Sequence, residues 1–362
     1  MVVGTTTTAT TTTVLGAFYL QMSELWEEFY QAYLDCRRRK RGTDEAIIFE
    51  MNENFNLLKL FNDIINRTYE VSPSYVFVVF YPKPREVFAA NYRDRIVHHW
   101  FYNRVINDIE KDLYPHSYSC RKGMGTLKAI DDSYIRMMEL SKENRDLCVF
   151  KGDIESFFVN IDKSVIKRLM QPYLKDELTS YLFYKIIDND PTIDCIYRCS
   201  KRRWKLIPNE KSLFGKINRG LPIGNLPSQM FANLYLSDFG KFIISSGFND
   251  IFIYVDDFVI FSPTMELIKE KLNEISSYLL FNLRLTLHNK KRYVQHHSKG
   301  FRLLGAIIMP YRKYIGKHIV KSFYLNLNNN DKFISYWGLM KHYKTYNIRK
   351  LAFNMAKYVY NR

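Results

Sequence analysis

The stretch IFIYVDDFVIF, residues 251–261, places two adjacent carboxylates between two runs of β-branched and aromatic residues. The flanking runs, 251–255 and 258–261, predict two short strands joined by a two-residue loop. Such loops favour Asn-Gly or Gly-X, which tolerate positive φ, and Asp256-Asp257 offers neither. Like charges held side by side in an apolar setting are costly unless they are protonated or neutralised by a cation. The pair therefore predicts a functional site, with a divalent metal as its simplest partner.

The other acidic side chains of the sequence support this interpretation. Asp131-Asp132 lies in AIDDSYIRMMEL, where both carboxylates suit a solvated helix start and need no special explanation. Asp153, by contrast, ends an apolar strand in VFKGDIESFF. Two strands that each bring carboxylates to a sheet end form a site for two cations ~3.5–4 Å apart, which suits phosphoryl transfer. The alternative is a set of buried acids that are paired with Arg or Lys.

The bulk composition indicates a large globular chain with an anionic partner. The 362 residues, 47% of them hydrophobic, predict one large domain or two to three small ones. The 53 Lys and Arg against 37 Asp and Glu give a net charge of +16, which suits a polymer of phosphates. Aromatic residues reach 16%, and rings interleaved with basic residues suit stacking on unpaired bases. The alternative is a basic surface without such a partner.

Several other classes of protein are disfavoured. The five cysteines are scattered and odd in number, and Cys195 and Cys199 have no further Cys or His nearby to complete a zinc site. No apolar stretch approaches the ~18 residues of a membrane span. Residues 1–22 are threonine-rich and lack the charged start of a secretory signal, so we expect them to be disordered, with Met22 as a candidate start codon. A cytoplasmic protein without a membrane partner follows by default.

The pattern along the chain mixes helices and strands without strict alternation. A helix with a Ser23 cap is expected over residues 23–40 and ends in a basic cluster, and strands flank a Pro-Lys-Pro turn at 82–84. Residues 190–220 are irregular and basic, and they lead through a Gly/Pro turn into a long helix. This order favours an α+β fold with a palm-like sheet over a doubly wound one.

At this point the motifs become recognisable as a set. YVDD, with KGDIESFF upstream and GLPIGNLPSQMFAN between them, resembles the palm of a reverse transcriptase. Most members of that family have Gln before the Gly of the middle motif, where this chain has Ile223. That form resembles the reverse transcriptases of diversity-generating retroelements, as do RDRIVHHW, SYSCRKGMGT, KSLF, KGFRLLG and SYWGLMKHYKTYNIR. The likeness runs from about residue 25 to 350.

The resemblance implies an α+β right-hand polymerase fold with fingers, palm and a short helical thumb. The expected divisions after the N-terminal segment are 23–145 for the N-terminal helices and fingers, 146–310 for the palm with the catalytic acids, and 311–362 for the helical thumb. About a dozen residues follow the thumb-like motif, so a ribonuclease H or endonuclease activity is expected to come from another protein.

The resemblance also assigns the catalytic centre. Asp153 and Asp256 would bind two Mg²⁺ ions, or Mn²⁺ as a substitute, with the Ile154 carbonyl assisting and Asp257 nearby. Lys290 in LHNKKRY matches the lysine near the leaving pyrophosphate, where it would act as general acid. Its neighbour Lys291 is the alternative.

Further residues match the positions that bind nucleotide and primer. Phe158 falls at the sugar-discriminating position, where a ring excludes a 2′-hydroxyl and implies a DNA product; the alternative is a core aromatic. Arg85, and secondarily Lys83, fall where the fingers bind the triphosphate, unless they are solvated turn residues. Leu304 and Gly305 in FRLLGA resemble the turn that grips the primer.

The middle motif bears on fidelity. Ile223, Gly224 and Gln229 fall where the family contacts the incoming nucleotide. A branched aliphatic side chain at residue 223 cannot make the hydrogen bond of Gln, so base discrimination should fall. The alternative is that Ile223 only packs under the turn that follows it.

The predicted function is therefore RNA-directed DNA synthesis on a template-repeat RNA, giving adenine-mutagenised cDNA for gene diversification. The resemblance implies as partners a template RNA, a DNA or RNA primer, dNTPs and an accessory variability determinant protein. The alternatives are a retron- or defence-type reverse transcriptase, a catalytically inactive RNA-binding scaffold, and a generic basic nucleic-acid-binding protein.

Overall fold

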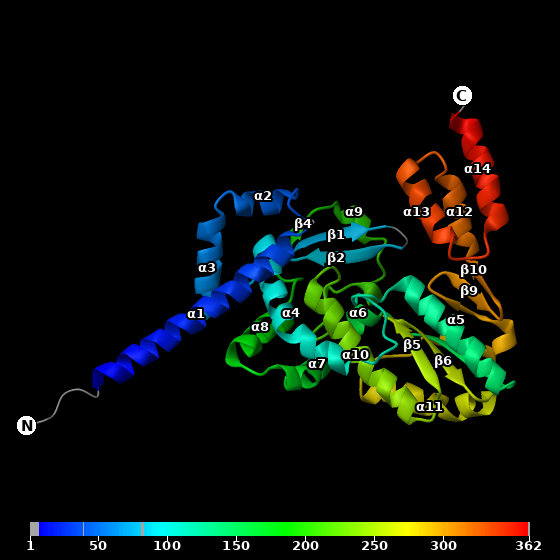
Figure 1. The fold of residues 1–362 in the computed structure, drawn as a ribbon, viewed down its shortest axis with the longest axis horizontal. Coiled ribbons are helices and arrows are strands. Elements are labelled where there is room, and N and C mark those ends of the chain that lie inside the picture. The colour runs from blue at the N-terminus through cyan, green and yellow to red at the C-terminus, as the bar shows by residue number, and fades with distance from the viewer. Residues whose placement is uncertain (1–6, 39, 81–82, 361–362) are drawn as a thin grey trace, which may run out of the picture. The chain divides into compact units, whose positions relative to one another are not determined.

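The chain folds into two compact units that each combine helices and strands (Figure 1). The computed structural model describes residues 7–38, 40–80 and 83–360. The first unit comprises Met1–Asp112 and Asp162–Phe231, and the second comprises Leu113–Ile161 and Ala232–Arg362.

The first unit is built mainly of helices around an aromatic core. Phe29, Phe61 and Trp100 meet with ring centroids 5.1–6.0 Å apart and join three of these helices. The N-terminal helices are α1 (Thr7–Arg37), α2 (Asp44–Glu50), α3 (Glu53–Ile65) and α4 (Tyr92–Asp112). The later segment adds α7 (Lys163–Met170), η1 (Gln171–Tyr173), α8 (Glu177–Asp188), α9 (Lys201–Trp204) and η2 (Asn209–Lys211).

The N-terminal helix is longer than the sequence predicts. We expected disorder over residues 1–22 and a Ser23 cap, but α1 runs from Thr7, so Ser23 lies inside it. Each added residue of an existing helix gains one backbone hydrogen bond, so a helix held by packing extends through residues of modest propensity. The packing comes from Phe29, Ala32, Tyr33 and Cys36, which are almost fully buried. Residues 1–6 lie outside the described residues.

A three-stranded sheet completes the first unit. β1 (Tyr75–Val79) and β2 (Arg85–Ala89) pair antiparallel on either side of the expected Pro-Lys-Pro turn, of which Pro82 lies outside the described residues. β4 (Ile196–Tyr197) adds in parallel to β1 and gives the order β2-β1-β4.

The second unit is built on a four-stranded antiparallel sheet of order β5-β6-β3-β7. Gly152 of β3 lies opposite Phe258 of β6, and a Cβ at Gly152 would meet the Phe258 ring at 2.2 Å, so only glycine fits there. Helices α5 (Thr126–Glu143) and α11 (Met265–Phe281) pack on the sheet (Figure 1). The strands are β3 (Cys148–Asp153), β5 (Asp250–Tyr254), β6 (Asp257–Ser262) and β7 (Tyr293–His296).

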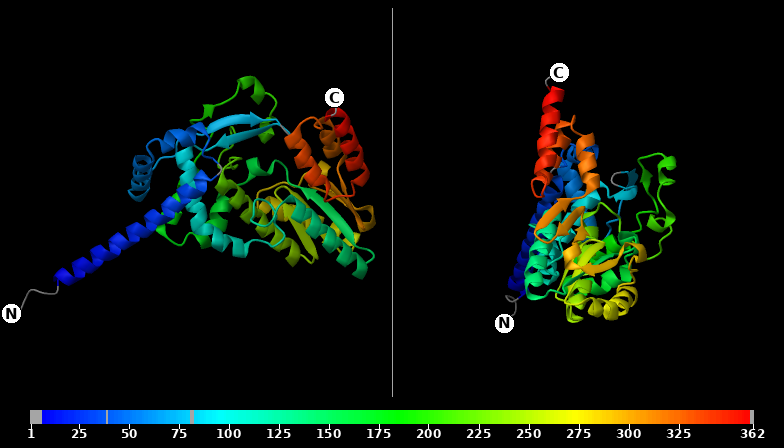
Figure 2. Two further views of the ribbon diagram at one scale, coloured as in Figure 1. Left: turned by 45° about the horizontal axis from the view of Figure 1, so that its top comes forward. Right: turned by 90° about the vertical axis from the view of Figure 1, so that its right-hand side faces the viewer.

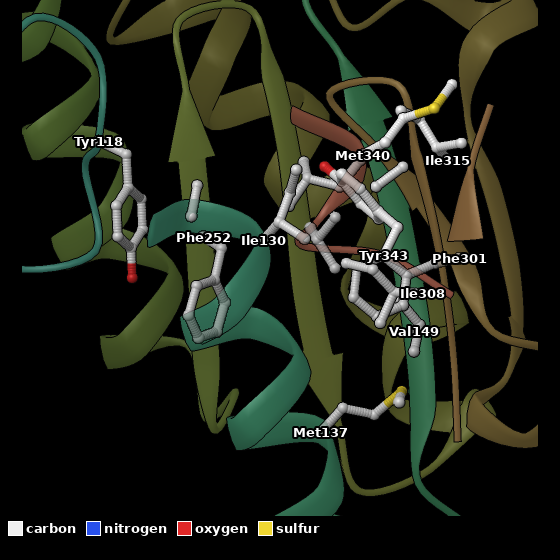
Figure 3. Close-up of a cluster of buried hydrophobic side chains, with 14 of the residues drawn as sticks. Tyr118, Ile130, Met137, Val149, Phe252, Phe301, Ile308, Ile315, Met340 and Tyr343 are labelled. Atoms are coloured by element: carbon white, nitrogen blue, oxygen red, sulfur yellow. The ribbon is translucent and has the colours of Figure 1, made fainter. Parts of the chain in front are cut away.

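Strands β8 (Phe301–Leu303), β9 (Ala306–Met309) and β10 (Arg312–Ile315) form a second antiparallel sheet in this unit. The helices that follow, drawn orange to red in Figure 2, are α12 (Lys317–Leu325), α13 (Asn330–Met340) and α14 (Tyr346–Tyr360). One buried cluster joins these helices to both sheets and to α5, as Figure 3 shows for Val149, Phe301, Ile308 and Met340.

The two units do not follow the expected domain boundaries. Residues 162–231, which we expected within the palm, group with the N-terminal helices, and residues 311–362 share the core of the second unit. The physical reason for the second difference is the common apolar cluster, which buries side chains from α12, α13 and α14 against β8 and β9. Helix α10 (Leu226–Ser245) has its first turns in the first unit and continues from Ala232 in the second.

Candidate active site

The three predicted acids meet at one end of the four-stranded sheet. Because β3 and β6 are antiparallel, the last residue of β3 lies beside the first residue of β6, and Asp153 pairs with Asp257. Asp256 occupies the turn that precedes β6, and its carbonyl accepts the Ile154 N–H at 2.9 Å. The sheet register therefore brings Asp153, Asp256 and Asp257 to one sheet end, as the sequence predicts.

The hairpin that carries the acidic pair differs by one residue from the expected form. Tyr254 pairs directly with Asp257, so the two-residue loop is Val255-Asp256 and not Asp256-Asp257. Val255 has φ of +56°, which is rare for a β-branched residue. Such a conformation costs of order 1–3 kcal/mol and persists where the surrounding structure enforces it. The turn therefore holds Asp256 in a strained loop, while Asp257 belongs to the strand.

Two lysines neutralise acids of this cluster. Lys151 of β3 forms an ion pair with Asp257, and their side chains are only 9% and 23% exposed. The Lys151 ammonium also donates to the Gly152 carbonyl at 2.8 Å, and burial lowers the pKa of this lysine to about 8 against the pull of Asp153 and Asp256. Lys291 binds Asp153 with Nζ 2.7 Å from Oδ1. These positive charges offset the repulsion between the clustered carboxylates.

The donor chemistry of the sheet end suits a divalent cation. Carboxylate oxygens and a backbone carbonyl are the hard ligands that Mg²⁺ binds. Within the part of the chain that the structure describes, however, no three His, Cys, Asp or Glu side chains are arranged as a metal-binding group. The ammonium groups of Lys151 and Lys291 engage Asp257 and Asp153 instead. The residues therefore fit the metal by the chemistry of their oxygen atoms and not by their arrangement in this structure.

The structure distinguishes the two candidate lysines after His288. Both lie in η3 (Asn289–Lys291), and only Lys291 contacts Asp153. Lys290 is exposed, and its backbone N–H donates to His288 Nδ1 at 3.2 Å. The His288 N–H in turn donates to the Asp153 carbonyl at 2.8 Å, which holds this short helix beside the sheet end.

Phe158 lies in the short helix α6 (Phe157–Asn160), five residues beyond Asp153. Its ring is half-buried and makes a T-shaped contact with Phe157 at 5.5 Å between centroids. Phe157 is the buried member of the pair and packs on Tyr235. Phe158 is therefore not a fully buried core aromatic, which leaves its ring accessible to a ligand.

The predicted nucleotide-binding residues of the first unit lie around β2. Lys83 and Arg85 are exposed at the start of this strand. Ile223 is half-buried in the turn before α10, and Gln229 is half-buried in the first turn of that helix. The side chains of Arg85 and Lys83 are thus exposed to solvent, so a triphosphate could reach them.

The turn after Ile223 is held by its glycine and asparagine. Gly224 has φ of +112°, and a Cβ there would lie 3.1 Å from Val87 Cγ1 of β2. Asn225 is buried, and its Oδ1 accepts the Ala90 N–H at 3.1 Å. The turn therefore approaches β2 closely, and Gly224 is required by both its conformation and its contact.

The predicted primer-gripping residues form the loop between β8 and β9. Leu304 and Gly305 have φ of +49° and +83°, the pattern of a tight hairpin turn with positive φ at both positions. The Gly305 carbonyl accepts the Gly316 N–H at 2.8 Å, which joins this turn to the start of α12.

Two residues of these sites were missed by the sequence analysis. Lys151 interrupts the apolar run of β3 two residues before Asp153, and that interruption was a usable signal. Glu86 is 5% exposed in β2, where strand alternation points it inward. Its three hydrogen-bond donors come from residues 204–213, more than a hundred positions away, so the sequence held no local signal for them.

Three carboxylates thus lie at one end of an antiparallel sheet, two of them in a hairpin with a strained turn. The family model described as reverse transcriptase (RNA-dependent DNA polymerase) matches residues 81–308. The chain belongs to this reverse transcriptase family, which implies a palm-and-fingers polymerase fold. No curated protein matches the sequence. Among the described residues, no helix combines the length and apolar character needed to cross a membrane.

The solved structures that match this chain include two yeast telomerases. The apo telomerase of Candida tropicalis, truncated from the C-terminal domain, shares 13% identity at a TM-score of 0.47 over 71% of this chain and 59% of its own. The telomerase of Candida albicans, in complex with a TWJ fragment of telomeric RNA, shares 11% identity at a TM-score of 0.47 over 78% of this chain and 55% of its own. The chain thus spans less than two thirds of either telomerase.

Proposed function

We propose that this chain is the reverse transcriptase of a diversity-generating retroelement, which copies a template-repeat RNA into adenine-mutagenised cDNA. Membership of the reverse transcriptase family supports RNA-directed DNA synthesis. The single observation that carries the specialised part is Ile223, which stands where most of the family has Gln. The other motifs that resemble this group support the same assignment.

The proposed chemistry starts from the acids of the palm sheet. Asp153 and Asp256, with the Ile154 carbonyl, would hold two Mg²⁺ or Mn²⁺ ions, and Asp257 would lie beside them. When bound, the ions would activate the primer hydroxyl and stabilise the leaving pyrophosphate. Lys290 is our proposed general acid, and Lys291, which contacts Asp153, is the alternative donor.

The remaining residues would select and hold the substrates. Phe158 would exclude a 2′-hydroxyl, so that the product is DNA. Arg85 and Lys83 would bind the triphosphate, with the planar guanidinium suited to two oxygens at once. Leu304 and Gly305 would grip the primer, and helices α12, α13 and α14 would form the short thumb.

Low fidelity follows from the side chain at residue 223. A Gln amide at this position can hydrogen-bond a neighbouring nucleotide, and the Ile223 side chain has no polar atom to do so. Gly224 and Gln229 would remain as contacts to the incoming nucleotide. The loss of one hydrogen bond of about 1 kcal/mol corresponds to about a fivefold loss of discrimination.

The test is the error spectrum of Ile223→Gln beside Ile223→Val, which keeps an aliphatic side chain. Both variants copy one RNA, and the cDNA is sequenced. We expect Gln to lower the error rate about fivefold, most strongly opposite template adenine, and Val to leave the spectrum unchanged. An unaltered spectrum at equal activity would refute the role of Ile223, and a structured non-coding RNA or a toxin gene beside this gene, in place of a template and variable repeat pair, would favour a retron- or defence-type reverse transcriptase.

Catalysis itself is tested by Asp256→Asn, with Asp131→Asn as the matched control. Asp131 pairs with Lys313 at a surface where its side chain is 40% exposed, so its loss should have little effect. Asp256→Asn should lower primer extension by several orders of magnitude while RNA binding persists. Extension at the wild-type rate would exclude the assigned centre, and a scaffold without catalysis would show no extension in any variant.

The proposed partners are those of such a retroelement. They are a structured template RNA, a DNA or RNA primer, dNTPs and an accessory variability determinant protein. The basic cluster at the end of α1 is one surface that could bind this RNA. One of its side chains, Arg37, already forms an ion pair with Glu50, with Nε 2.7 Å from Oε1.

A further inference from the structure

The segment between α8 and α10 extends the β1–β2 pair of the first unit through β4. Residues 190–220 are mostly irregular, as expected, with short elements at β4, α9 and η2, and β4 pairs with β1. The Ile196 N–H donates to the Ser74 carbonyl at 2.8 Å, and the Arg198 N–H donates to the Val76 carbonyl at 2.9 Å. Figure 1 accordingly places β4 and α9 beside β1 and β2. None of the proposed catalytic steps uses this segment.

A buried carboxylate holds the segment in place. Glu86 accepts hydrogen bonds from Trp204 Nε1 at 2.9 Å, Ser212 Oγ at 2.6 Å and the Leu213 N–H at 2.8 Å. Removal of such a buried acceptor would leave three donors without their partner. Phe214 stacks nearly parallel on Tyr197 at an interplanar angle of 8°, which adds an aromatic contact to the polar one. The extension is therefore a built surface and not a loose loop.

Its outer face combines basic and aromatic side chains. Residues 196–206 contain five basic residues and no acidic one. Tyr197 is 47% exposed and Phe80, at the end of the neighbouring strand, is 41% exposed. Arg203 lies over the Phe80 ring at 5.4 Å. We define the basic-aromatic surface as these exposed residues: Phe80, Ile196, Tyr197, Arg198, Arg202, Arg203, Lys205 and Leu206.

Exposed aromatic rings beside basic side chains indicate a ligand that has both unpaired bases and phosphates. Exposed rings offer stacking platforms that are tolerant of base identity, and guanidinium groups pair with phosphates. Paired bases cannot stack on side chains, because their faces are covered by the next base pair. Of the basic residues, Arg198 is partly engaged by Glu45 at 2.7 Å. Arg202, Arg203 and Lys205 carry the phosphate-binding part of the argument.

We propose that the basic-aromatic surface binds an unpaired stretch of RNA, with bases stacked on Tyr197 and Phe80 and phosphates on Arg202, Arg203 and Lys205. The choice of RNA rests on the proposed function, which supplies an RNA template as partner. The surface would hold part of that RNA without taking part in catalysis.

The test measures binding of the full chain to an unstructured RNA of roughly 12 nucleotides by fluorescence anisotropy, from about 0.05 to about 0.2 M salt. Arg202→Gln with Arg203→Gln should weaken binding at least about fivefold and reduce the salt slope by about 1.4. Tyr197→Ala should weaken it about tenfold with an unchanged slope. The matched control is Lys142→Gln with Lys269→Gln, which removes two exposed charges from α5 and α11 and should change binding less than twofold.

The same series with an RNA duplex and with single-stranded DNA identifies the ligand. We expect Tyr197→Ala to leave duplex binding unchanged and the wild type to prefer RNA over DNA. Equal losses in the control, or an equal effect of Tyr197→Ala on the duplex, would overturn the proposal, as would a preference for DNA. Unchanged melting temperatures exclude misfolding. Because the assay needs no DNA synthesis, it is independent of the spectrum of Ile223→Gln, which tests the function.

Discussion

The ion pair between Lys151 and Asp257 should be a major element of stability at the palm sheet. Lys151→Met keeps the length of the side chain and removes its charge, which leaves Asp257 in a site where it is only 23% exposed. Breaking a buried pair from one side costs about 3–5 kcal/mol, because the remaining charge is uncompensated. For a unit of this size that corresponds to a fall in melting temperature of roughly 6–20 °C.

A double-mutant cycle isolates the pair from the packing of the lysine stem. Because buried ion pairs are replaced by neutral groups at little cost, Lys151→Met with Asp257→Asn should regain all but about 1 kcal/mol of the wild-type stability. Lys291→Met is the matched control, since Lys291 also binds an acid of the site but is 49% exposed. Its loss should cost no more than about 1 kcal/mol.

The assay is urea unfolding followed by circular dichroism for the wild type, the single variants and the double variant. The reasoning would be refuted if Lys151→Met cost no more than Lys291→Met, or if the second substitution added to the loss. Either result would mean that water solvates the Asp257 carboxylate well enough when Lys151 is absent.

Three further outcomes are expected. Phe158→Val should raise ribonucleotide incorporation relative to deoxyribonucleotide at least about tenfold in single-nucleotide extension, and an unchanged ratio would place the sugar gate elsewhere. Gly224→Ala should lower the free energy of unfolding by about 1–3 kcal/mol in thermal melts, because φ is +112° there, whereas Gly42→Ala, with no heavy atom within 4 Å, should have little effect. Burial raises the pKa of Asp94 to about 6 from 3.8, so the stability that its protonated form contributes is complete below pH 3.8 and is lost as the pH rises through 6. The unfolding free energy of the wild type minus that of Asp94→Asn should therefore fall by about 2–2.5 kcal/mol between pH 4 and pH 7, and a flat difference would exclude a buried neutral carboxyl.

Several features could be predicted because they depend on neighbours in the chain. The apolar runs around Asp256 specify a hairpin, and the apolar run before Asp153 specifies a further strand, so the acids were expected at one sheet end. The cap of α7 is equally local, since Asp162 Oδ1 accepts the Ser164 N–H two residues on at 2.8 Å. The Gly224 turn could be anticipated from the Gly and Pro residues around it. Family motifs added roles to these residues that their local pattern does not carry.

Other features were decided by contacts between segments that are distant in the sequence. The sequence by itself indicated which acids meet at one sheet end, while β-sheet register decided that Val255, and not Asp257, occupies the strained loop. Tertiary packing also decided which lysines neutralise the acids, because Lys291 reaches Asp153 across a separation of 138 residues. It also bound residues 204–213 to Glu86. Local propensity sets the strands and turns, but hydrogen bonds and charges between remote segments form only once the sheet and its core have assembled.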